Sequence, residues 1–183
     1  MRLFIGLPLP DELRLILARH LEPWKARRDE LKWVDSGQYH FTLQFLGETA
    51  PDRLPGLIES LGKVSCRSDF SLETGQAFAM PPGPKARVLA LGLLSGVKAL
   101  RELAHCVREA TAAAGFPPEA RDFKAHLTLG RVRRGRKLLL EPEELGRPPL
   151  PAFQARAFHL YESELRREGP VHSSLLEVRL GRS

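Results

Sequence analysis

Two short runs of this sequence share the pattern His-x-Thr-x and constrain the fold more than any other feature. They are residues 40–43 (His-Phe-Thr-Leu) and 126–129 (His-Leu-Thr-Leu), whose histidines lie 86 residues apart. Each run lies in an apolar stretch closed by glycine, 39–47 and 125–130, as is typical of a β-strand. Because strand side chains alternate between faces, each strand should present its imidazole and hydroxyl on one face, about 6–7 Å apart.

These four polar side chains suit phosphoryl transfer without a metal ion. An unperturbed histidine titrates at about pH 6.5, so one imidazole can be neutral while its partner is charged. The neutral one can take a proton from an attacking water, and the charged one can donate a proton to the departing oxygen. Threonine hydroxyls can donate to the non-bridging phosphate oxygens. We therefore predict His40 and His126 as the catalytic pair and Thr42 and Thr128 as substrate-binding residues.

The motif histidines and threonines also have simpler interpretations than catalysis. A single histidine can lie on a surface or in a core without any function, and threonine is favoured in strands by propensity alone. A zinc site needs three or four ligands, often with a His-x-x-x-His or Cys-x-x-Cys pair, and the sequence contains neither. The duplication of the motif favours catalysis, so we predict an enzyme without metal or cofactor.

Hydrophobic patterning predicts two similar series of elements. Strands are expected over residues 2–9, 33–34, 39–47, 70–78, 87–93, 125–130, 153–162 and 175–180. Helices are expected over residues 11–21, 51–61 and 96–114. Each series contains a strand, a helix and a motif strand, so the order indicates an α+β fold with antiparallel sheets. The 183 residues fit one domain or two small lobes, and 43% of them are hydrophobic, which is ordinary for a globular protein.

Positive charge is concentrated beside the second motif. The net charge is +6, and between residues 115 and 140 seven basic residues stand against two acidic ones. Such a bias favours an anionic partner such as RNA. The basic run over residues 133–137 fits a solvated turn, and it also fits steering of an RNA backbone.

Other features bear on where the protein resides. Proline and acidic residues at positions 8–12 interrupt the first apolar run, which argues against a secretory signal. No stretch approaches the roughly 20 apolar residues of a membrane helix. Cys66 and Cys106 show no metal-type spacing, and no disulfide framework is expected. These features predict a cytoplasmic protein without membrane attachment.

The motifs and their flanks resemble the 2H phosphoesterase superfamily, and most closely its bacterial and archaeal branch of RNA 2′,3′-cyclic phosphodiesterases, once described as 2′-5′ RNA ligases. The resemblance covers nearly the whole chain and includes residues 1–7, 32–34, 40–48, 125–131, 160–163 and 169–170. It implies two pseudo-symmetric lobes of antiparallel sheet with outer helices and a central cleft that holds one motif from each lobe. Because the lobes interleave in that fold, we expect a single bilobal domain over residues 1–183.

The resemblance also implies an activity and residue roles. Cyclic phosphate ends of RNA would be opened to 2′-phosphate ends, with His40 as the proton donor and His126 as the base. Arg131 fits the family pattern after the second motif and would hold phosphate. Strict alternation places Arg131 on the face opposite Thr128, but a bulge at Gly130 could re-aim it.

Two rival functions were considered beside this activity. One is action on another 2′-linked nucleotide, including 2′-5′ RNA ligation, and the other is an RNA-binding module with idle histidines. The expected partner is RNA or an oligonucleotide with a cyclic phosphate end, and the chain is expected to be a monomer. His172 stands where the resembled pattern has an aromatic residue, so it fits either a solvated loop or a position that stacks on a base.

Overall fold

The two strands that carry the motifs, β3 (His40–Glu48) and β6 (Leu127–Val132), are neighbours near the centre of one antiparallel sheet. The structure is a computed structural model that describes residues 1–64, 68–117, 122–166 and 169–181. Within these ranges the sheet has nine strands in the order β7-β4-β5-β6-β3-β1-β8-β9, with β2 paired to β6. The other strands are β1 (Arg2–Pro8), β2 (Leu31–Trp33), β4 (Phe70–Met80), β5 (Val88–Ser95), β7 (Phe153–Ala155), β8 (Ala157–Leu165) and β9 (Pro170–Arg179).

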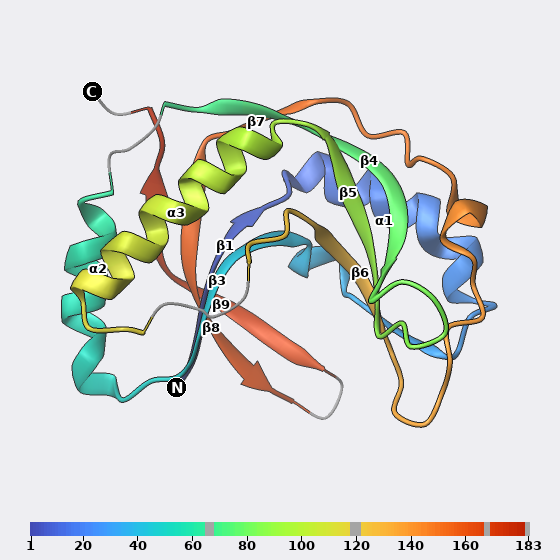
Figure 1. Ribbon diagram of the computed structural model, residues 1–183, viewed down its shortest axis with the longest axis horizontal. Helices are drawn as coiled ribbons and strands as arrows, with labels where there is room; N and C mark the ends of the chain where they lie inside the picture. Colours follow the sequence, from blue (N-terminus) through green and yellow to red (C-terminus); the bar gives the residue numbers. More distant parts are fainter. Residues whose placement is uncertain (65–67, 118–121, 167–168, 182–183) are drawn as a thin grey trace.

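Helices cover the outside of the curled sheet at its two ends (Figure 1). The helices α2 (Leu54–Gly62) and α3 (Val97–Ala113) pack together beside β1, β3, β8 and β9, and Ser60 Oγ donates to Ala110 O between them. The helix α1 (Asp11–Lys25) lies on the other side, beside β4, β5 and β6. The helix α1, which follows β1, therefore covers strands that include β5 and β6, and α3, which follows β5, lies beside β1 and β3.

The core explains why the motif strands hold their position. The apolar partners within the motifs, Phe41, Leu43, Leu127 and Leu129, are all 1% exposed or less, whereas the motif histidines and threonines are only partly buried. This is the alternation that the sequence predicts. A one-residue slip of either strand would move this apolar set out of the core, so hydrophobic burial fixes the register that positions the polar residues.

Two predicted strands differ from those observed. Residues 153–162 were expected to form one strand, but the chain forms β7 and β8, which are separated at Arg156 because β7 pairs with β4 whereas β8 pairs with β1 and β9. The last strand begins at Pro170 rather than at residue 175, since β9 pairs with β8 from Leu165↔Pro170 onward. The first difference arises from a pairing partner that is distant in sequence, and the second from the hairpin between consecutive strands.

The structure also bears on the predicted location. None of the described helices has the length and apolar character needed to span a membrane. The prediction of no disulfide is wrong for Cys106, which is disulfide-bonded. Cys66 lies outside the described residues. Because disulfides are rare in reducing compartments, the cysteines do not support a cytoplasmic location, which stays a prediction.

Candidate active site

The pairing between β3 and β6 sets the geometry of the site. These strands share the antiparallel pair Phe41↔Leu127, which are the central residues of the two motifs. In an antiparallel register, this pair places each motif histidine level with the threonine of the other motif. The two imidazoles and the two hydroxyls are therefore arranged around a local two-fold axis.

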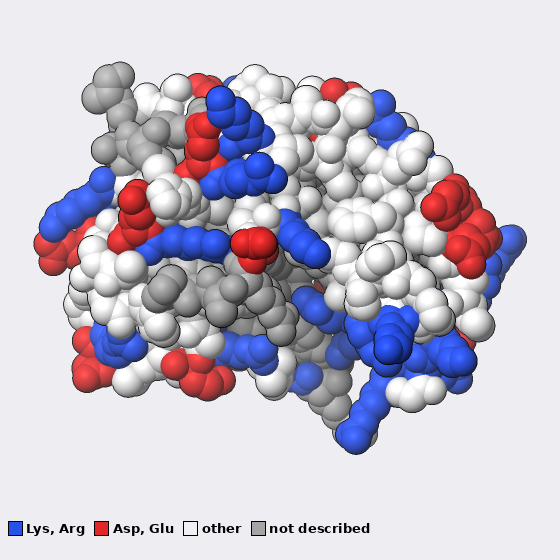
Figure 2. All heavy atoms as spheres, in the orientation of Figure 1, with Lys and Arg blue, Asp and Glu red and all other residues white. Residues whose placement is uncertain are grey.

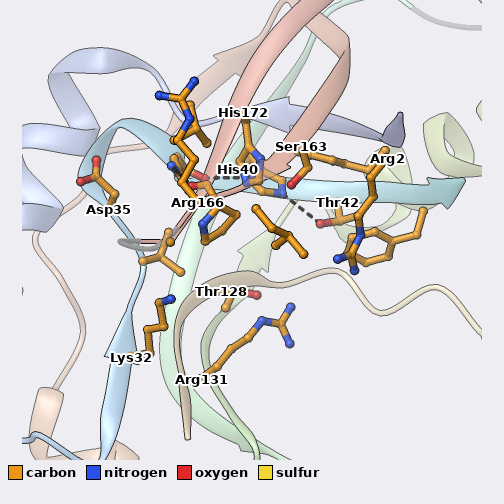
Figure 3. Close-up of a pocket in the computed structure, with 18 of the residues that line it drawn as sticks. Arg2, Lys32, Asp35, His40, Thr42, Thr128, Arg131, Ser163, Arg166 and His172 are labelled. Atoms are coloured by element: carbon orange, nitrogen blue, oxygen red, sulfur yellow. Dashed lines mark hydrogen bonds between the residues drawn. The ribbon is translucent and has the colours of Figure 1, made fainter. Parts of the chain in front are cut away.

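The ring of His40 is held at both of its nitrogens (Figure 3). Nδ1 lies 2.7 Å from Gln38 O, and Nε2 lies 3.1 Å from Thr42 Oγ1. A carbonyl oxygen can only accept, so Nδ1 carries the hydrogen and Nε2 of the neutral ring accepts from the Thr42 hydroxyl. Gly6 of β1 lies against this ring, since a Cβ at position 6 would approach His40 Cδ2 to 3.0 Å.

Burial lowers the pKa of His40 to about 4. The physical cause is the lost hydration of the charged ring. The hydrogen bond to Gln38 opposes this effect and raises the pKa, while the charges of His172, Arg14 and His126 lower it further. His40 is therefore neutral at pH 7 in the free protein.

His126 immediately precedes β6 and is held in a similar way. Its Nδ1 lies 2.7 Å from Lys124 O, and because that oxygen can only accept, Nδ1 carries the hydrogen here too. Burial lowers the pKa of His126, and the charges of Arg131 and Lys124 act in the same direction. The charge on His126 in turn lowers the pKa of His40, so the two imidazoles interact electrostatically.

A β-bulge in β6 brings Arg131 into the same cleft as Thr128. Adjacent residues of β5 pair with Gly130 and Thr128, so Leu129 is an extra residue in β6. Leu129 and Gly130 are both buried, which resets the alternation. Strict alternation, which would place Arg131 opposite Thr128, does not hold; the bulge considered at Gly130 occurs with Leu129, one position earlier, as the unpaired residue.

A cleft of about 740 Å³ lies over the motif strands (Figure 3). The cleft is lined by residues that include His40, Thr42, Thr128 and Arg131, whereas His126 is not among its lining residues. The structure therefore brings four of the five predicted site residues into one cleft, with the fifth in electrostatic contact with His40.

Other cleft residues were missed by sequence reasoning. Three cations, Arg2, Lys32 and Arg166, line the cleft together with Phe45, whose ring is 51% exposed. Figure 3 shows Arg2 beside Thr42, and Lys32 with Arg131 on the far side of the cleft. No signal in the sequence marks Phe45, because strict alternation from Phe41 and Leu43 would place its ring in the core.

His172 lies on β9 and faces His40. Its ring is edge-on to His40 with centroids 5.6 Å apart, and edge-on to Phe4 at 4.7 Å. The solvated loop that was one interpretation of His172 is wrong, because pairing with β8 makes this segment a strand. Burial lowers the pKa of His172. Stacking of His172 on a base stays a prediction.

The basic run after β6 is partly engaged in the fold. Arg133 Nε donates to Asp29 O at 2.9 Å, and Arg136 pairs with the Asp29 carboxylate at 3.0 Å. Figure 2 shows Lys and Arg side chains gathered on the face where the turn after β6 lies. Arg121, counted with these residues in the sequence, lies outside the described residues. Within the described ranges, no three His, Cys, Asp or Glu side chains form a group that could hold a metal ion.

Comparison with known families decides where the chain belongs. A family model described as LigT-like phosphoesterase matches residues 7–89 and 93–172. The chain belongs to this family. The resemblance to 2H phosphoesterases is thereby confirmed, and the chain is an enzyme of a phosphoesterase family.

Named relatives of this LigT-like phosphoesterase support one kind of activity. The RNA 2′,3′-cyclic phosphodiesterase of Archaeoglobus fulgidus is 31% identical over 177 residues, covering 96% of this chain and 98% of that protein. The RNA 2′,3′-cyclic phosphodiesterase of Bacillus subtilis is 33% identical over 135 residues, or 72% of each chain.

Solved structures confirm the predicted α+β fold. The crystal structure of E. coli LigT complexed with 3′-AMP matches with a TM-score of 0.79 at 25% identity, covering 99% of this chain and 98% of that chain. The shared architecture is a curled antiparallel sheet with helices outside. That structure also shows that LigT binds a nucleotide.

Proposed function

We propose that this chain is a metal-independent RNA 2′,3′-cyclic phosphodiesterase that leaves a 2′-phosphate end. The observation that carries the proposal is the pairing of β3 with β6, which groups the two His-x-Thr motifs beside one cleft. The named relatives support the same substrate class. The positive charge of the chain suits an anionic RNA end.

The proposed reaction is an in-line displacement at phosphorus. A water oxygen forms a bond to phosphorus while the bond from phosphorus to O3′ breaks. The neutral imidazole takes a proton from the water, and the charged imidazole gives a proton to O3′, so the pair ends the step with its proton exchanged between the two rings. The strained ring of the cyclic phosphate already presents O3′ as a leaving group.

The resemblance assigns the donor role to His40 and the base role to His126. Burial opposes a charged His40 in the free protein. A cyclic phosphate in the cleft adds a negative charge close to the ring, and an opposite charge favours the protonated imidazole. The assignment therefore places the proton on His40 once substrate is bound.

The remaining polar residues stabilise the phosphoryl group. Thr42 and Thr128 are level with the opposite histidines and donate to non-bridging oxygens, where charge accumulates. Arg131 adds a fixed positive charge to the same cleft. The exposed ring of Phe45 offers a flat apolar surface for the terminal base.

We further infer that residues 1–183 act as one bilobal unit. One continuous sheet joins both groups of strands, and the site draws a motif from each group. A cut between the halves would separate α1 from β5 and β6, and α3 from β1 and β3. The monomeric state stays a prediction.

Identification of the product tests the proposal directly. The protein is incubated with a dinucleotide that ends in a 2′,3′-cyclic phosphate, and the products are separated by chromatography against authentic 2′- and 3′-phosphates. The expected product is the 2′-phosphate. A predominant 3′-phosphate would contradict the proposed bond cleavage, and binding without any turnover would support the RNA-binding module instead.

The same assay tests for a metal requirement. Neither the sequence spacing nor the described side chains provide a group of three metal ligands. Treatment with EDTA is therefore expected to leave the rate unchanged. Loss of activity that a divalent cation restores would contradict metal independence.

A further inference from the structure

A second hollow, of about 870 Å³, lies where β1 ends and α1 begins. Its polar lining includes Arg14, Gln154, Arg156, His159, Tyr161 and Ser174, with the carboxylates of Asp11 and Glu12 on its exposed rim. None of these residues has a part in the reaction described above.

A row of aromatic rings joins the second hollow to the cleft. Phe4, which lines the cleft, stacks on Tyr161 with centroids 5.0 Å apart, and Tyr161 stacks on His159 at 5.4 Å. The registers of β1 with its two neighbours place Gly6 level with both Thr42 and His159. His159 therefore lies two strands from Thr42 on the same face of the sheet, roughly 10 Å away.

Arg14 brings a positive charge into the second hollow. Its side chain is 20% exposed and pairs at 3.0 Å with Asp11, which is 90% exposed. Its Nε is buried, and no hydrogen-bond acceptor for it occurs in the described part of the chain. In addition to burial, the charge of Arg14 lowers the pKa of His40 and of His159, so Arg14 lies within electrostatic range of both rings. Exposed ion pairs contribute little, so a phosphate oxygen can replace the Asp11 carboxylate.

Two contacts span the cleft. Gln38 Nε2 donates to Pro170 O at 2.5 Å. The Lys32 side chain lies beside Gly169, which precedes Pro170, because a Cβ built at Gly169 would lie 3.6 Å from Lys32 Nζ. These contacts join the segment after β2 to the start of β9.

We propose that the second hollow binds the nucleotide on the 5′ side of the cyclic phosphate end. This inference rests on the proposed function and extends it to the part of the RNA that precedes the reacting nucleotide. Arg14 holds the connecting phosphodiester through a charge-assisted hydrogen bond. The base of that nucleotide stacks on His159 and Tyr161, and because every base offers a flat face, the subsite has little preference among bases.

Comparison of two substrates tests the proposal. kcat/KM is measured on a 2′,3′-cyclic mononucleotide and on a dinucleotide that ends in the same cyclic nucleotide. The wild type is expected to prefer the dinucleotide. Arg14→Gln is expected to lower the ratio of dinucleotide to mononucleotide kcat/KM by about tenfold, the loss of one charged hydrogen bond. His159→Ala is expected to lower the ratio by about fivefold or more, the loss of one stacked base.

A matched control comes from the same helix. Arg19 is exposed on α1 and does not line either hollow, so Arg19→Gln should keep the wild-type ratio. A wild type without preference for the dinucleotide, or an unchanged ratio in both Arg14→Gln and His159→Ala, would overturn the subsite. An equal loss on both substrates in both variants would overturn it as well, since these residues would then act on the reacting nucleotide. A wild type that turns over neither substrate would instead show that the proposed function is wrong.

Discussion

His40 and His126 differ in their surroundings although their motifs match. His40 lies among the rings of Phe4 and His172, and burial lowers its pKa to about 4. His126 lies outside the cleft lining beside Arg131, and burial lowers its pKa too. Above pH 6.5, few protein molecules without substrate therefore carry a proton on either His40 or His126 beyond the one that each neutral ring holds. In the proposed mechanism, the negative charge of the bound substrate favours protonation of one of the two rings.

The buried His40 should make stability depend on pH. Its pKa is lower in the folded protein than in the unfolded chain, so between about pH 4 and pH 6.5 the unfolded chain binds more protons. Stability is then lost as the pH falls through this window. Relative to His40→Gln, the wild type should lose about 2 kcal/mol of unfolding free energy between pH 7.5 and pH 5. Urea unfolding at both pH values measures this, and an equal gap at the two values would contradict a buried neutral His40.

At the scale of elements, local patterns in the sequence were enough to predict the strands but not their partners. The alternation around both motifs correctly predicts which residues enter the core. The division into β7 and β8 could not be predicted, because it depends on pairing of β7 with β4, which is far away in sequence. The early start of β9 comes from its hairpin with the neighbouring strand β8, and the polar residues 172–174 give no apolar alternation that would predict it. A bulge that could turn Arg131 toward the cleft was considered at Gly130. Its exact position could not be predicted, since pairing with β5 makes Leu129 the extra residue.

The contact between β1 and β3 should be necessary for activity. A methyl group at position 6 would meet His40 Cδ2 at 3.0 Å and Phe41 O at 3.3 Å. Gly6→Ala should therefore displace the His40 ring and lower kcat by roughly 10- to 100-fold while the protein stays folded. Gly92→Ala on β5 is the control, since its Cβ would meet no atom closer than 3.7 Å. Equal turnover by the two variants would show that the position of this ring does not limit the rate.

For the whole molecule, the two motifs can be recognised in the sequence, but the complete lining of the cleft cannot. The cleft cations lie outside the two His-x-Thr motifs: Arg2 is on β1, Lys32 is on β2, and Arg166 follows β8. They reach the cleft because β1, β2 and the connection between β8 and β9 surround the paired motif strands. The second hollow is equally a product of the fold, since α1, β1 and β8 meet there. Such surfaces follow from topology rather than from local sequence.

The central claim is that two histidines share one proton and act as an acid–base pair. The most direct measurement is kcat/KM between pH 4 and pH 10 on a dinucleotide with a 2′,3′-cyclic phosphate end, for the wild type, His40→Ala and His126→Ala. Because kcat/KM reports the free enzyme and both pKa values are lowered, the wild type should give a bell with its maximum below pH 6.5. The two limbs belong to the coupled pair rather than to either ring alone.

Each single variant should lose one limb of the bell and at least about 10²-fold in rate. The lost limb differs between the variants if one histidine is the acid and the other is the base. Residual activity that keeps both limbs in both variants, or a rate like that of the wild type in either one, would contradict the two-histidine mechanism.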